Sequence, residues 1–109
     1  MKAWDVSADI QADATLSGRV ESYRPVVEEV LGQSAPLVEA RWSVVASGGE
    51  RRFILTLSDW TYPAGVEATF GMDALPTTFD TRWKIHRLWG DLLQARNHQQ
   101  LDELLEAGA

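Results

Sequence analysis

The chain has 109 residues, of which 45% are hydrophobic and 24% are charged, and its formal net charge at pH 7 is −6. This size and composition are typical of one globular domain, residues 1–109, with a core large enough to fold without cross-links. The absence of cysteine excludes disulfides, thiolate zinc sites and cysteine nucleophiles, and the acidic balance argues against a protein that binds nucleic-acid phosphates.

No apolar run in the chain is long enough to form a membrane-spanning helix. Asp5, Asp9 and Asp13 interrupt the segment where the apolar stretch of a signal peptide would lie. We therefore expect a cytoplasmic protein that does not contact a membrane.

Residues 4–20 alternate strictly between two kinds of side chain. Every even position from Trp4 to Val20 is apolar or small, and every odd position from Asp5 to Glu21 is polar. This period of two predicts extended chain with one buried face. A straight strand of this length would be longer than a domain of this size. The segment is therefore either a hairpin with a three-residue turn over 11–13 or one strand that bends at Ser17-Gly18.

A short helix is predicted over residues 24–32. Pro25 is tolerated in a first helical turn, Glu28 and Glu29 lie near the positive end, and Gly32 is placed to end the helix. Residues 33–36 then form a loop.

The strongest local signal is a β-hairpin with strands over 37–47 and 50–59. Gly48-Gly49 supplies a two-residue turn in which both centres accept positive φ. This turn sets a register that pairs Trp42 with Leu55 on an apolar face. On the same face it pairs Val44 with Phe53 and Ala40 with Leu57. A third strand is predicted over 65–71.

A long helix is predicted over about 77–96, with Thr77 or Thr78 as its cap. Its apolar positions fill more than half of the helical wheel, whereas a surface helix needs only a stripe of about 100°. The helix should therefore contact two things, the sheet and either the short helix, the chain's own C-terminal segment or another subunit. Asn97 either breaks this helix or caps a new one, and Leu101, Leu104 and Leu105 continue its apolar face.

Together these elements predict an α+β fold. An antiparallel sheet of four or five strands packs on the long C-terminal helix, with the short helix over 24–32 beside it. The order short helix, three strands, long helix is similar to that of a double-stranded-RNA-binding domain. This likeness concerns topology alone, because Thr77-Thr78-Phe79-Asp80 stands where that family has a basic helix start.

The segment from Arg87 to Arg96 resembles a stretch near the C-terminus of small uncharacterised bacterial proteins, with the sequence RLWGDLLQ at its centre. The resemblance covers about a tenth of the chain. It implies no activity.

The sequence contains no recognisable catalytic or metal-binding motif. The two histidines, His86 and His98, do not have the spacing of a zinc site. Gly48-Gly49 lies in a hairpin and opens no helix that would bind phosphate. We therefore expect no catalytic residues, no metal and no cofactor.

Two groups of residues are candidates for binding. On the long helix, His86 lies one turn from Trp83 and one turn from Trp89, which predicts a dry aromatic environment for its ring. It is either a structural histidine with a hydrogen-bond partner or part of a ligand pocket. In the loop after the hairpin, Trp60 and Tyr62 have outward parity, while Asp59 faces inward and needs a partner such as Arg82 or Arg96.

We interpret the chain as a small acidic protein-interaction or oligomeric accessory domain without catalytic activity. Its partner is another protein or a second copy of itself, with a homodimer favoured. The alternative is a small-molecule-binding domain or simple acid–base enzyme with an aromatic pocket of Trp42, Trp83, His86 and Trp89, and Asp59 at its rim. A dimer without such a cavity supports the first interpretation, and a monomer with one supports the second.

Overall fold

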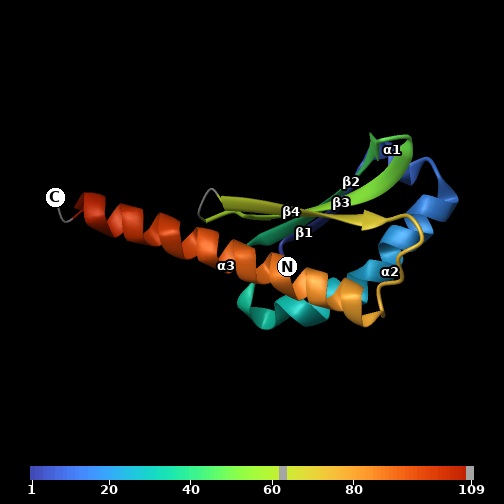
Figure 1. The fold of residues 1–109 in the computed structure, drawn as a ribbon. Helices are drawn as coiled ribbons and strands as arrows, with labels where there is room; N and C mark the ends of the chain where they lie inside the picture. The colour runs from blue at the N-terminus through green and yellow to red at the C-terminus, as the bar shows by residue number, and fades with distance from the viewer. Residues whose placement is uncertain (62–63, 108–109) are drawn as a thin grey trace.

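The computed structural model describes residues 1–61 and 64–107. Its elements, in chain order, are β1 (Ala3–Val6), α1 (Ala8–Gln11), α2 (Ala14–Leu31), the short 3-10 helix η1 (Gly32–Ser34), β2 (Val38–Ser47), β3 (Glu50–Asp59), β4 (Ala64–Gly71) and α3 (Phe79–Ala107). The protein has the predicted α+β architecture, with one sheet and a long C-terminal helix that runs beneath it (Figure 1).

The sheet has four strands in the order β1-β2-β3-β4. β2, β3 and β4 are antiparallel neighbours, but β1 lies parallel to β2. The sheet is therefore mixed, whereas the sequence predicted a wholly antiparallel sheet. The connection from β1 to β2 contains the helices α1 and α2, as a parallel pair requires.

The predicted register of the β2–β3 hairpin is confirmed at every position, including the pair Trp42 and Leu55. Gly48 and Gly49 have φ values of 59° and 83°. The predicted two-residue turn needs a positive φ at both of these positions. Trp42, Phe53 and Leu55 are fully buried on the apolar face, and the third strand follows as β4. The turn residues and the side-chain pattern thus specify the same pairing.

The prediction for residues 7–20 is wrong. Only the chain up to Val6 is extended, and neither a hairpin nor a bent strand follows it. Residues 14–31 form α2, because Asp13 caps the helix by accepting hydrogen bonds from the backbone N–H groups of Thr15 (2.9 Å) and Leu16 (3.2 Å). The predicted short helix over 24–32 is the second half of α2, and Pro25 lies inside it.

The true period of this segment is helical. Leu16, Val20, Tyr23, Val27 and Leu31 are spaced three or four residues apart and are all buried. The alanines Ala8, Ala12 and Ala14, which completed the apparent alternation, are exposed. Alanine is a strong helix former that carries little burial information, and it imitated the pattern of a strand.

The core is a layer between the sheet and the two helices α2 and α3. Trp42, Tyr23 and Phe70 meet at its centre, with ring centroids 5.0–5.9 Å apart. α3 supplies Ile85, Leu88, Trp89 and Leu92 to the same layer. Arg41 and Glu67 are exposed, and their parity places them on the opposite face of the sheet.

α3 is longer than predicted. Thr78 caps it as expected, since its hydroxyl accepts from the Thr81 N–H and its carbonyl accepts from the Arg82 N–H. The helix then continues without a break through Asn97 to Ala107. Its last turns project beyond the sheet (Figure 1), which gives the molecule extents of 52 × 26 × 22 Å.

Candidate functional site

α3 has an apolar face on each of two sides. The inner face consists of Ile85, Leu88, Trp89 and Leu92, which are at most 9% exposed and pack on the sheet and α2. The second face, which we call the outward stripe, consists of residues three or four positions apart, namely Phe79, Trp83, His86, Gly90, Leu93, Asn97, Leu101 and Leu104. All eight are exposed, so the core takes up only one of the two faces.

The large apolar side chains of the outward stripe have high exposed fractions. Phe79 is 80% exposed, Trp83 53% and Leu104 69%, and Leu105 beside the stripe is 71% exposed. Isolated exposed apolar residues are ordinary, but a row in which five of eight exposed residues are large and apolar is a mark of an interaction site. The possibility that Leu101, Leu104 and Leu105 cover the surplus face from within is wrong, because these residues are themselves on the projecting part of α3 and exposed.

Trp83 lies between two shallow grooves. One, of about 420 Å³, runs between β4 and α3 and is also lined by Thr69, Lys84 and Arg87. The other, of about 380 Å³, includes Phe79. The Arg87 guanidinium lies 5.6 Å from the centre of the Trp83 ring, within the range of a cation–π contact.

Lys84 joins α3 to the outer edge of the sheet. Its ammonium donates a hydrogen bond to the backbone carbonyl of Thr69 in β4. Burial lowers the pKa of Lys84, and the nearby charge of Arg52 lowers it further. The lysine thereby satisfies a carbonyl of an edge strand that would otherwise be open to another strand.

The predicted aromatic environment of His86 does not form. His86 is exposed and Trp83 is half exposed, whereas Trp89 lies in the core and Trp42 is fully buried. The four side chains therefore do not line one space. The reason is rotation around the helix, since Trp83 and His86 belong to the outward stripe and Trp89 belongs to the inner face.

Asp59 has the partner that its inward position required. Its carboxylate is 3.1 Å from Nε of Arg96 on α3 and also accepts the Thr61 N–H at 2.8 Å. This ion pair fastens the end of β3 to the middle of α3 at the point where the helix leaves the sheet. Arg82, the other predicted partner, instead lies 3.2 Å from Glu29 of α2.

Trp60 is 60% exposed, which agrees with its outward parity in the sequence. Its indole N–H donates to the Glu39 carboxylate at 3.2 Å, and the Lys2 ammonium lies 5.1 Å from the ring centre. Tyr62, the other aromatic predicted in this loop, lies outside the described residues. Trp60 is thus held in a local cluster well away from the outward stripe in sequence.

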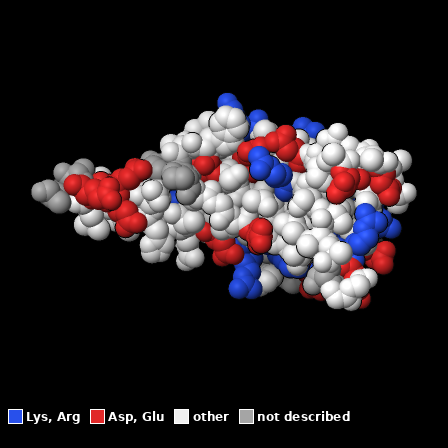
Figure 2. Space-filling view, turned by 90° about the horizontal axis from the view of Figure 1, so that it is seen from above, with Lys and Arg blue, Asp and Glu red and all other residues white. Residues whose placement is uncertain are grey.

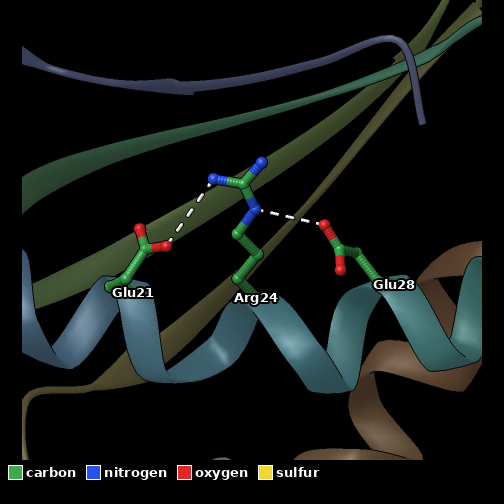
Figure 3. A network of polar contacts seen from close by, with 3 residues as sticks. All are labelled: Glu21, Arg24 and Glu28. Atoms are coloured by element: carbon green, nitrogen blue, oxygen red, sulfur yellow. Dashed lines mark hydrogen bonds and ion pairs between the residues drawn. The ribbon is translucent and has the colours of Figure 1, made fainter.

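A third polar cluster lies on α2. The Arg24 guanidinium stands between the carboxylates of Glu21 (3.6 Å) and Glu28 (3.1 Å) (Figure 3). It also lies 5.6 Å from the centre of the Trp4 ring in β1. Because Arg24 is held by two carboxylates of its own helix and by the Trp4 ring, we interpret the cluster as a contact between α2 and β1 and not as a binding site.

Within residues 1–61 and 64–107, no group of three or more histidine, aspartate or glutamate side chains could hold a metal ion. Over the same residues, no helix has the length and apolar character needed to cross a bilayer. Comparisons of the chain with family models, with curated proteins and with solved structures gave no match. The geometry of the outward stripe is therefore the main guide to function.

The sequence singled out Trp83 and His86 and predicted that Leu101, Leu104 and Leu105 continue the apolar face of the long helix. It left open whether the helix breaks at Asn97, and the unbroken helix places Leu101 and Leu104 in one row with Trp83. It did not predict that Trp83 and Trp89 lie on different faces.

Proposed function

We propose that this protein is a small acidic protein-interaction or oligomeric accessory domain that binds a protein partner through the outward stripe of α3. The partner is another protein or a second copy of the chain. The observation that supports this most directly is the exposed apolar row along a helix whose opposite face already fills the core.

Physical considerations support an apolar docking role. Complete burial of one large apolar side chain contributes about 1.5–3 kcal/mol. The outward stripe offers five such side chains in a line, Phe79, Trp83, Leu93, Leu101 and Leu104. Even partial burial of these five would offset a substantial part of the cost of association.

Site-specific photo-crosslinking tests the proposal. A photoreactive phenylalanine analogue placed at Leu101 is compared with the same analogue at Leu75, because the two leucines are 56% and 57% exposed. In the cells from which the protein comes, we expect covalent adducts from position 101 and only background from position 75. Equal background from both positions would contradict the proposal.

A further inference from the structure

We infer that the partner of the outward stripe is a second copy of the chain, and that the two α3 helices pair in antiparallel orientation. This inference rests on the proposed function and adds the identity and direction of the partner. It requires that one stripe be complementary to itself when reversed, and charge, size and polarity along α3 all satisfy that requirement.

Charge along α3 is divided between its two ends. The head of the helix, residues 79–90, carries three basic side chains and one acidic one, namely Arg82, Lys84, Arg87 and Asp80. The tail, residues 97–106, carries three acidic side chains and no lysine or arginine, the acids being Asp102, Glu103 and Glu106. Figure 2 shows acidic side chains gathered at the projecting end of the molecule. An antiparallel pair sets each acidic tail against a basic head, and a parallel pair would set tail against tail.

The outward stripe is also complementary in shape when it is reversed. When Gly90 is aligned with Leu93 of the second copy, the Leu93 side chain lies over a glycine, which has no side chain. The same alignment brings Phe79 opposite Leu104, and Trp83 within one residue of Leu101. Phe79 and Trp83 at the head are 80% and 53% exposed. Leu101 and Leu104 at the tail are 56% and 69% exposed, so the reversed pairing covers both groups.

The polar members of the outward stripe agree with this alignment. His86 falls opposite Asn97, which lets an imidazole and an amide hydrogen-bond across the pair. On the flank, Arg82, which lies 3.2 Å from Glu29 of its own chain, comes within two residues of Glu103 of the second copy and would stand between two carboxylates. Shifting the helices by one heptad either way would leave Phe79 and Trp83, or Leu101 and Leu104, without a counterpart. A parallel pair would instead bring Arg82 close to Arg87 of the other copy.

Self-association is the first test. Sedimentation of the purified chain from about 1 to 100 µM should show a concentration-dependent dimer. Leu101→Gln should weaken dimerisation at least about tenfold, and the matched control Leu75→Gln should change it less than about twofold. Gly90→Glu should weaken it similarly with the fold intact, because a side chain built at Gly90 meets nothing within 4 Å in its own chain.

Orientation is the second test, and it uses the absence of cysteine from the natural chain. Phe79→Cys and Leu104→Cys each introduce a single thiol, and a short bismaleimide links two thiols that lie close together. Mixing the two variants, tagged to differ in mass, should give a crosslinked mixed dimer, while each variant alone gives little product. Efficient crosslinking of each variant alone would indicate parallel helices and overturn the inference.

The outcomes separate this inference from the proposed function. A chain that remains monomeric at about 100 µM, while position 101 forms adducts with a different protein in cells, overturns the self-pairing and leaves the proposed function in place. A monomeric chain without adducts at position 101 overturns both.

Discussion

The inner face and the outward stripe of α3 are two surfaces of one helix that differ in exposure, since the first is buried in the core and the second is open to water. Leu92 is fully buried against the sheet, while its neighbour Leu93 is 38% exposed on the outward stripe. Both surfaces have the periodicity of a buried helix face. Periodicity in a sequence therefore indicates which side chains are to be covered and does not say what covers them. Burial in the folded chain supplies that information, and it divides α3 into a surface that packs in the core and a surface that stays exposed.

The charges of α3 reinforce this division. Near the sheet, Lys84 and Arg96 are each used within the fold, by the Thr69 carbonyl and by Asp59. Beyond Arg96 the acidic residues of the tail face water. These two basic side chains thus have partners in their own chain, whereas the acidic side chains of the tail are exposed.

The largest expected difference between the two surfaces comes from adjacent leucines. Leu92→Ala should lower the free energy of unfolding by about 3 kcal/mol, because it leaves a cavity in the core. Leu93→Ala should lower it by less than about 1 kcal/mol at micromolar protein concentration, because this side chain is already partly hydrated. Urea titration of both variants measures the difference, and the same alanine in the same helix controls for helix propensity. Equal losses would mean that the two faces are not distinct in the folded monomer.

A smaller effect is expected where α3 is fastened to β3. Asp59→Asn should destabilise the protein by about 2 kcal/mol, because it leaves the Arg96 guanidinium without its carboxylate in a largely buried setting. The quarter of the Arg96 side chain that remains exposed limits the loss. Asp91→Asn on the same helix is the matched control, since Asp91 is exposed. A loss of unfolding free energy no greater than that of the control would show that the ion pair does not hold α3 against β3.

The hairpin and the N-terminal segment show why sequence reasoning succeeded in one place and failed in another. In the hairpin, the turn and the alternation come from different residues, and both require the pair Trp42 and Leu55. In residues 7–20 the alternation had no independent support, and it depended on alanines that are exposed. Two independent local signals specify a structure more reliably than one long pattern.

The candidate site was predicted in part for a similar reason. The helical wheel indicated that α3 has more apolar surface than one sheet can cover, and this is confirmed. It could not separate Trp83 from Trp89, because the boundary between covered and uncovered surface depends on where α2 and β4 lie against the helix. The sequence predicted that Asp59 pairs with a cation such as Arg82 or Arg96, and the structure shows that the partner is Arg96. A buried carboxylate at the rim of a sheet requires a cation but does not specify which one.

The smallest effect concerns Tyr23, on the side of α2 that meets the inner layer. The Tyr23 hydroxyl donates to the Ala74 carbonyl at 3.0 Å, and the side chain is fully buried. Burial raises the pKa of Tyr23 above its ordinary value of 10.0, although the charge of Arg19 lowers it in part. The folded chain therefore keeps the phenolic proton at pH values where the unfolded chain releases it. Protein stability should fall as the pH rises above 10, because the folded state then binds more protons than the unfolded state.

Tyr23→Phe removes this titration together with the hydrogen bond. Near pH 8 the variant should be less stable than the natural chain by about 1 kcal/mol, the usual contribution of one hydrogen bond. Above pH 10 the difference should shrink, because only the natural chain is destabilised by release of the tyrosine proton. Lys84 acts in the opposite direction, since its lowered pKa makes stability rise toward pH 10.5, but it is present in both proteins and cancels in the comparison. Urea titrations at pH 8 and pH 10.5 measure the difference, and a gap that stays constant would show that the Tyr23 hydroxyl titrates alike in the folded and unfolded chains.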